Sequence, residues 1–521
     1  MDERLQALVI DLKTASQLSS AELAKRVRRS NWLADAPASE RLLFWFEVAS
    51  LDMPLSPPAD ALLRQAAGEL VQRWRTAAKN VEPLSDDEVP AISSLYEQLG
   101  SGSSARADLL AALTLTASDA AIESAVELLV SDPPASDNDL ARAMSPLFRK
   151  RSIRPELLFP RLLDALSHAP VAAAVLDLAN YLTRENVVSE HPAADRGVQL
   201  IHLLGEMTAS LSMLEERPDQ HATGAIDLSR KVASSVALLV SLCDAVAQIG
   251  SEAAIPKLYQ VHDLAHRRLK TEAAAALAKL GDEQGIKYLT ELAAEPVARL
   301  RVIAYAEELG LLDKIEPEHQ SGTARAEAEL AVWLAEPTQF GLPPARLELL
   351  DHRTQFWPGY NDEVPCYLFR FHYSVTVEGD ERVYSNLGIA GPLTYAFTAD
   401  LEDLSPDDIY AAFAGFQAEH EEIRQYDVER LSRAEKLEVE RLKRRLHDAG
   451  YTDIEPVQMG YFFGERALIA TVKIEGLGGV AVVDFQDHAF FPARSTRRPI
   501  GPREAYCIYK GRRLLKTFNR K

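Results

Sequence analysis

The densest group of chemically versatile side chains in this sequence lies in residues 482–499. Asp484, Asp487 and His488 come at the end of an apolar, strand-like run. Carboxylates and an imidazole placed there could bind a metal or carry out acid–base catalysis. Aspartate is also common in turns, and the spacing matches no zinc or EF-hand pattern. We take these three residues as the candidate catalytic set, with a solvated loop as the alternative, and we expect neither a metal nor a cofactor.

Two further segments offer weaker chemistry. Glu419, His420 and Glu422 lie near the end of an expected helix, but the segment lacks the second histidine of a zincin motif. Gly388 and Gly391 could let backbone amides surround an anion, although no Gly-Lys-Ser or Gly-Lys-Thr sequence accompanies them. Neither segment carries a complete catalytic or phosphate-binding signature.

The segment 491–521 is strongly basic, whereas the chain as a whole is acidic. It holds ten Lys or Arg residues and one acid, a net charge of +9, against −29 for the remainder. Clustered cations with interleaved aromatics are typical of nucleic-acid surfaces, and the candidate phosphate contacts are Arg497, Arg498, Arg512 and Arg513. The acidic remainder would repel a polyanion, and the tail could instead dock on that acidic surface. We therefore do not expect nucleic acid as the partner.

A turn at residues 356–365 gathers three aromatic residues, Phe356, Trp357 and Tyr360. Exposed aromatics of this kind anchor protein interfaces. The same residues could instead fill the junction between a helical region and a second domain. Both interpretations remain open from the sequence.

Composition and length limit the class of protein. The chain has 521 residues, a net charge of −20 and 47% hydrophobic residues, which is typical of folded proteins. Charges at positions 2–4 argue against a secretory leader. Three scattered cysteines fit a reducing cytoplasm and exclude a cysteine-only zinc site. The most apolar stretch, residues 232–250, is interrupted by Asp244 and by serines, so we predict a buried helix and no membrane span.

A repeat in residues 243–315 predicts the architecture that must carry these groups. Glycines recur at 250, 281 and 310, and the residues around them match in type, as at Leu258 and Leu289. Apolar positions three and four apart mark one helix face, and each glycine would end a helix with a positive φ. A fixed period of about 30 residues predicts helical hairpins stacked in a solenoid.

The segment 278–310, "AKLGDEQGIKYLTELAAEPVARLRVIAYAEELG", resembles the short bacterial HEAT repeats also found in phycobilin lyase subunits. Weaker units lie at 117–132 and 154–182, where the turn glycine is missing. The resemblance covers roughly residues 105–336. It implies an α-solenoid that binds proteins as a scaffold or adaptor, and its lyase branch permits an enzyme or protein-maturation factor.

From about residue 340 the sequence becomes rich in aromatic and β-branched residues, with turn signals between them. In residues 366–375 the alternation places Tyr367 and Phe369 on one face and Leu368 and Arg370 on the other. The order of strands, helices and strands indicates an α+β domain. Strands are predicted at 346–351, 365–377, 382–390, 467–475, 479–485 and 504–510, and helices at 405–423 and 428–449.

The predicted fold is therefore mainly α: an α-solenoid of HEAT-like hairpins followed by a smaller α+β domain. The expected regions are a helical N-terminal part at 1–100, the solenoid at 101–338 and the α+β domain at 339–521. The expected function is a cytoplasmic, bacterial scaffold or adaptor with a protein partner. The alternatives are an enzyme or maturation factor with its site in the C-terminal domain, and a nucleic-acid accessory protein that uses the basic tail.

Overall fold

The computed structural model describes residues 1–27, 31–76, 84–115, 118–148, 154–217, 224–377, 380–396, 401–422, 424–462, 465–493 and 500–519. The chain divides into two compact units, Met1–Leu289 and Thr290–Lys521, and each is described by itself. The predicted fold class is confirmed, because a helical array is followed by a part that combines helices with two antiparallel sheets. The division lies before residue 339, so the last helices of the array belong to the second unit.

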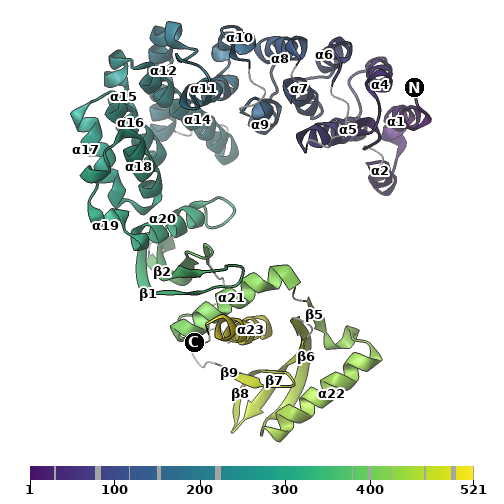
Figure 1. Ribbon diagram of the computed structural model, residues 1–521, viewed down its shortest axis with the longest axis vertical. Coiled ribbons are helices and arrows are strands. Elements are labelled where there is room, and N and C mark those ends of the chain that lie inside the picture. Colours follow the sequence, from purple (N-terminus) through teal and green to yellow (C-terminus); the bar gives the residue numbers. More distant parts are fainter. Residues whose placement is uncertain are drawn as a thin grey trace. The chain divides into compact units, whose positions relative to one another are not determined.

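The first unit consists of helices that pair and stack in chain order. They are α1 (Glu3–Thr14), α2 (Ser20–Val27), α3 (Asn31–Ala34), α4 (Ala38–Ala49), α5 (Pro57–Arg75), α6 (Glu88–Gln98), α7 (Arg106–Leu115), α8 (Asp119–Ser131), α9 (Asp137–Met144), α10 (Pro155–Leu158), α11 (Ala169–Arg184), α12 (Gly197–Glu216), α14 (Ala225–Ile249), α15 (Ile255–His262), α16 (Arg267–Lys279) and α17 (Glu283–Glu291), which crosses the division. In one row α4 contacts α6, α6 contacts α8 and α8 contacts α10 (Figure 1). In the other, α5, α7, α9, α11, α14 and α16 contact one another in sequence. One apolar core lies between the rows.

The repeated glycines end their helices as predicted. Gly250, Gly281 and Gly310 have φ of 75°, 81° and 68°. At Gly250 its own N–H bonds to the Ala247 carbonyl, and the next N–H bonds to the Val246 carbonyl. The same two bonds recur at the other two glycines. This pair of bonds is the Schellman motif, which satisfies the last carbonyls of a helix and requires the left-handed backbone that glycine adopts without strain.

Helix α14 has the length and apolar character of a membrane span, the one such helix in the described part of the chain. Within the unit, however, 56% of its most apolar window is buried. Leu238, Leu239 and Leu242 are fully buried in the core between the rows. The expectation of a buried repeat helix is therefore met for this segment.

A buried histidine holds the loop between α11 and α12. His191 is 4% exposed, and its Nδ1 accepts the Ala193 N–H at 3.1 Å. Its Nε2 lies 3.0 Å from the Asn180 Oδ1, and the Asn180 amide donates to the Ser241 carbonyl at 3.0 Å. An accepting Nδ1 and a donating Nε2 define the neutral ring. Burial lowers the pKa of His191 from 6.5 to about 4.

The second unit contains two sheets and the helices that cover them. Its elements are α18 (Pro296–Leu309), α19 (Pro317–Gln320), α20 (Gly322–Ala335), β1 (Arg346–Phe356), β2 (Glu363–Val377), β3 (Asp380–Ala390), β4 (Tyr395–Ala396), α21 (Pro406–Glu422), β5 (Arg424–Asp427), α22 (Arg433–Asp448), β6 (Thr452–Phe462), β7 (Glu465–Ile474), β8 (Leu477–Val483), β9 (His488–Pro492) and α23 (Pro502–Phe518). Strands β1–β4 form one antiparallel sheet and β5–β9 the other, each in sequential order.

The two sheets and their helices form five layers. Phe369 and its alternate neighbours on β2 face α20 through Leu330 and Leu334. Leu368, on the opposite face, packs in the cluster that contains α21 and α23. The same two helices contact the inner face of the second sheet, and α22 covers its outer face through residues such as Leu442. Helices α21 and α23 are thus the central layer of the unit (Figure 1).

The predicted strand at 504–510 is wrong, because these residues belong to helix α23. Residues 505–510 are all buried, since the helix lies between two sheets. A helix buried on every side has no polar face, so its sequence lacks the helical period and is easily taken for a strand. Strands β4, β5, β6 and β9 were not predicted, and β1 extends five residues beyond the expected strand.

Glycines set the distance between the two central helices. A Cβ atom at Gly511 would lie 1.7 Å from the Ala411 carbonyl oxygen, and one at Gly415 would lie 1.9 Å from the Cys507 carbonyl oxygen. Each helix therefore presents a glycine to the backbone of the other. No side chain other than hydrogen fits at either position without moving the helices apart.

We expect Gly511→Ala to destabilise the second unit by about 2 kcal/mol or more, because the steric cost outweighs the ~1 kcal/mol that alanine contributes to helix propensity. Urea unfolding followed by circular dichroism measures the change. Gly478→Ala is the control, since nothing lies within 4 Å of its added Cβ. Equal effects of the two substitutions would show that the helices can separate at little cost.

The neutral His191 predicts a pH dependence of stability. The unfolded histidine binds a proton near pH 6.5 and the folded one only near pH 4, so the free energy of unfolding falls as pH decreases between these values, by up to about 3 kcal/mol. Burial also lowers the pKa of His262 and His266, so the slope must be compared with that of His191→Gln. Urea titrations from pH 7 to 4 should give a smaller slope for the variant. If the pH dependence of the unfolding free energy were the same in His191→Gln, His191 would not be its cause.

Candidate functional site

The turn between β8 and β9 is closed by the side chain of Asp484. Its Oδ1 accepts the backbone N–H groups of Gln486 at 2.6 Å and Asp487 at 2.7 Å. The Asp484 N–H in turn donates to the Asp487 carbonyl at 3.0 Å. Aspartate suits this position because its short carboxylate reaches the amides two and three residues ahead.

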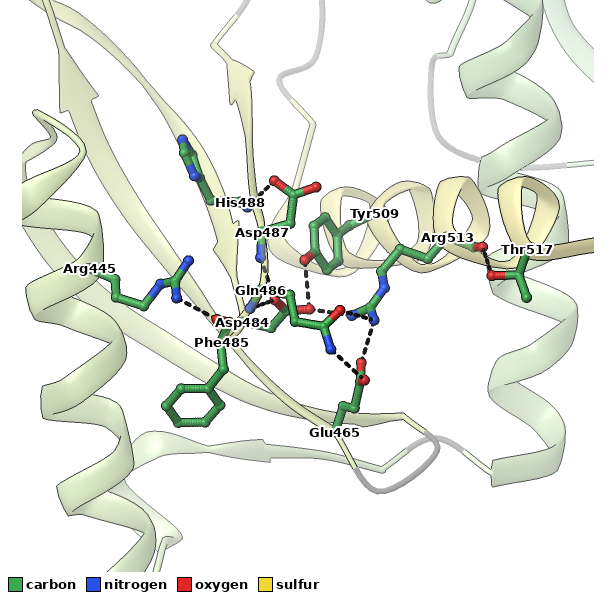
Figure 2. Close-up of polar contacts among 10 residues, drawn as sticks. All are labelled: Arg445, Glu465, Asp484, Phe485, Gln486, Asp487, His488, Tyr509, Arg513 and Thr517. Atoms are coloured by element: carbon green, nitrogen blue, oxygen red, sulfur yellow. Dashed lines mark hydrogen bonds and ion pairs between the residues drawn. The ribbon is translucent and has the colours of Figure 1, made fainter. Parts of the chain in front are cut away.

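The second oxygen of the same carboxylate fixes the turn to helix α23. Asp484 Oδ2 accepts the Tyr509 hydroxyl at 2.8 Å and also bonds to the Arg513 guanidinium (Figure 2). Arg513 extends the network to Glu465 on β7 at 2.6 Å. Burial, followed by the hydrogen bond to Asp484, raises the pKa of Tyr509. Asp484 is 2% exposed and its side chain bonds to four donors, so its role is structural.

The side chains of Asp487 and His488 do not join this network, although the Asp487 backbone bonds to Asp484. Both are exposed, and Asp487 Oδ1 accepts the backbone N–H of His488 at 2.8 Å. The His488 ring packs edge-on against Tyr451, with centroids 5.8 Å apart, and points away from Arg513 in Figure 2. The three candidate catalytic side chains are therefore neighbours in sequence without converging in space. In the described residues no group of three His, Cys, Asp or Glu side chains could hold a metal.

The basic segment is folded over most of its described length. Arg512 pairs with Asp408 at 2.6 Å, and Arg513 pairs with Asp484 and Glu465. Lys510 is 1% exposed, with its Nζ 4.3 Å from the centre of the Tyr506 ring. These cations thus contact acidic side chains and a buried aromatic ring of the same unit. Arg497 and Arg498 lie outside the described residues.

The three residues of the aromatic turn have different environments. Trp357 is fully buried, and its indole N–H donates to Gln417 on α21. The Phe356 backbone is held by the Asn519 side chain. Tyr360 is 42% exposed, with its hydroxyl bonded to the Pro392 carbonyl. Trp357 is therefore part of the core of the second unit, and of the three only Tyr360 offers an exposed ring.

Packing accounts for the two glycines considered for anion binding. A Cβ at Gly388 would lie 2.8 Å from the Leu330 side chain of α20. At Gly391, whose φ is 110°, a Cβ would lie 2.2 Å from the Pro365 carbonyl oxygen. Both positions are therefore glycine because another part of the chain approaches closely there. The side chains of Glu419, His420 and Glu422 lie outside the described part of the chain.

A pocket that the sequence did not reveal opens beside the β8–β9 turn. It has a volume of about 350 Å³ and is lined by Glu438, Glu465, Arg466, Asp484, Phe485 and Gln486. Glu438 comes from α22, Glu465 and Arg466 open β7, and the last three form the turn. Because these residues come from three separate segments, no sequence motif connects them. Of the lining residues, only Asp484 was among the candidates chosen from the sequence.

Ion pairs and ring contacts hold the walls of this pocket. Arg466 pairs with Glu438 and lies over the Tyr461 ring, 5.2 Å from its centre. The Tyr461 hydroxyl donates to Glu435 at 2.6 Å. Bonds from Ser432 and Tyr461 hold the pKa of Glu435 at about 2. Glu435 is thus ionised at neutral pH and accepts the hydroxyl of the ring that Arg466 covers.

Comparison with protein-family models finds no match, and comparison with curated proteins finds none either. The resemblance to HEAT repeats therefore stays a prediction.

We expect Asp484→Asn to destabilise the second unit by about 2–4 kcal/mol, because it removes the charge that Arg513 faces and leaves an amide among donors. Thermal and urea unfolding measure the loss. Asp487→Asn is the matched control: its side chain is exposed and an amide oxygen can still accept the His488 N–H, so its effect should stay within about 0.5 kcal/mol. A comparable loss of unfolding free energy in both variants would contradict the structural role of Asp484.

Proposed function

We propose that the protein is a scaffold or adaptor that binds another protein along its helical array. The observation that carries this proposal is the stacking of hairpins in two rows, in which a helix contacts mainly the adjacent helices of its own row. A stack of this kind leaves the outer faces of both rows open to solvent over its whole length. Such extended surfaces suit protein partners better than small substrates. The hairpins resemble HEAT repeats, which supports the same function.

The exposed apolar side chains of α1 and α4 are the first surface to test. Ile10, Leu43 and Phe46 are 58%, 45% and 55% exposed, and the two helices that carry them contact each other. The same helices bury their opposite faces in the core, for example through Leu8 and Phe44. Grouped, exposed large apolar side chains are typical of interaction surfaces. We therefore expect a partner with apolar side chains to cover these residues.

The other functions considered have less support. An enzyme that used Asp484, Asp487 and His488 would need them to converge, whereas the Asp484 carboxylate is already occupied by four donors. A nucleic-acid surface based on Arg512 and Arg513 would need cations that are now paired with acids. All three cysteines are buried thiols, which fits our proposal of a cytoplasmic protein.

We expect the tagged full-length protein to capture a stoichiometric protein partner from its native cells. The double variant Leu43→Glu with Phe46→Glu should lose that partner, because it places two charges in a surface that an apolar partner must desolvate. Quantitative mass spectrometry of the captured material measures the loss. Both side chains are exposed, so the fold should be retained, and circular dichroism checks this.

The control is Leu437→Glu, which places the same charge at a leucine that is 62% exposed in the second unit. It should leave capture unchanged. Capture of no specific protein by the wild type would refute the scaffold proposal. Equal capture by the double variant would show that the interface does not include these residues of α1 and α4.

A further inference from the structure

We propose that the pocket beside the β8–β9 turn binds the guanidinium group of an arginine side chain presented by a protein partner. This inference goes beyond the solenoid surface and rests on the proposed scaffold function for the statement that the arginine belongs to a protein. The recognition chemistry itself follows from the walls of the pocket. The glutamates supply acceptors for a guanidinium, and Phe485 supplies an aromatic ring.

The charge of the pocket favours a cation. Its ionisable lining consists of Glu438, Glu465, Asp484 and Arg466, a net charge of −2 that Arg513, paired with Glu465 and Asp484, reduces to −1. Asp484 is buried and bonded to four donors, so the carboxylates that remain accessible are those of Glu438 and Glu465, which are 26% and 42% exposed. Arg466 and Arg513 each bond to one oxygen of these glutamates, and the other Glu465 oxygen accepts a long bond of 3.5 Å from the Gln486 amide. A carboxylate offers about four acceptor sites, so both glutamates can still receive N–H donors from a ligand.

An aromatic ring at the rim favours arginine over lysine. Phe485 is 49% exposed, in a turn whose conformation is set by Asp484. Its backbone carbonyl accepts a hydrogen bond from Arg445 of α22, which fixes the base of the side chain (Figure 2). A planar guanidinium can stack on an aromatic face and at the same time donate in its plane to carboxylates, which an ammonium cannot do.

The pocket is large enough for a side chain, whereas the void next to it is not. A volume of about 350 Å³ admits one amino-acid side chain. Behind it lies a small void of about 10 Å³, which Glu465, Arg466 and Asp484 also line together with residues of α23. A void of that size holds about one water molecule. A ligand would therefore be bound by the two glutamates and Phe485, and would not reach Lys510.

The test uses the full-length protein and N-acetyl-arginine amide as the probe. Isothermal titration calorimetry should show saturable binding at about millimolar concentration, the affinity of a ligand of this size. N-acetyl-citrulline amide has nearly the same shape without the charge and should bind about tenfold more weakly. The lysine analogue should bind about threefold more weakly than the arginine probe, because an ammonium lacks the planar fork that stacks on a ring while it bonds to carboxylates. Citrulline binding as tight as arginine binding would overturn the proposal.

Variants locate the site. Glu438→Gln combined with Glu465→Gln should weaken the arginine probe by about tenfold, and Phe485→Ala by about threefold. Glu440→Gln, the same charge change on an exposed residue of α22, is the control and should have no effect. Phe485 is exposed, so its variant tests the pocket even if the double variant melts early. An equal loss with Glu440→Gln would show general electrostatic attraction and refute a defined site.

Failure of this inference can be told apart from failure of the scaffold function. If the wild type captures a protein partner but does not bind the probe, the pocket proposal is wrong and the scaffold proposal stands. If the probe binds as expected while no partner is captured, the pocket recognises guanidinium groups and its assignment to a protein arginine is refuted.

Discussion

The close contact between helices α21 and α23 is the constraint on which the second unit depends. Gly415 and Gly511 bring each helix against the backbone of the other, and the pair then presents apolar side chains to a sheet on either side. If the helices stood farther apart, the two sheets would lose their shared packing surface. The pocket and the β8–β9 turn depend on the same contact, because Tyr509 and Arg513 reach the turn from α23.

Asp484 shows how a polar group can be conspicuous in sequence for a structural reason. Its position after an apolar strand suggested chemistry, but the fold uses both of its oxygens, one to close a turn and one to attach a helix. A buried carboxylate is tolerated only when its charge and hydrogen bonds are matched. The more exposed groups around it, Glu438, Glu465 and Phe485, are those left available to a ligand.

Features set by local physics could be predicted from the sequence. The turn glycines at 250, 281 and 310 and the alternating faces of β2 follow from backbone conformation and side-chain period, and both are present. Features set by tertiary burial could not. Residues 505–510 are all buried because two sheets enclose them, so they show no alternation of apolar and exposed positions. The pocket joins three segments whose proximity no spacing in the sequence encodes. The candidate site was therefore found in part, through Asp484 alone.

The place of α23 in the chain has a consequence for biosynthesis. Residues 502–518 come after every strand of both sheets, yet they fill the layer between them. A ribosome delivers the chain from its N-terminus, so the hairpins of the first unit can stack as they emerge. The strands of the second unit, by contrast, must wait with an apolar face uncovered until α23 leaves the exit tunnel. During that interval the uncovered apolar faces of the nascent second unit favour aggregation.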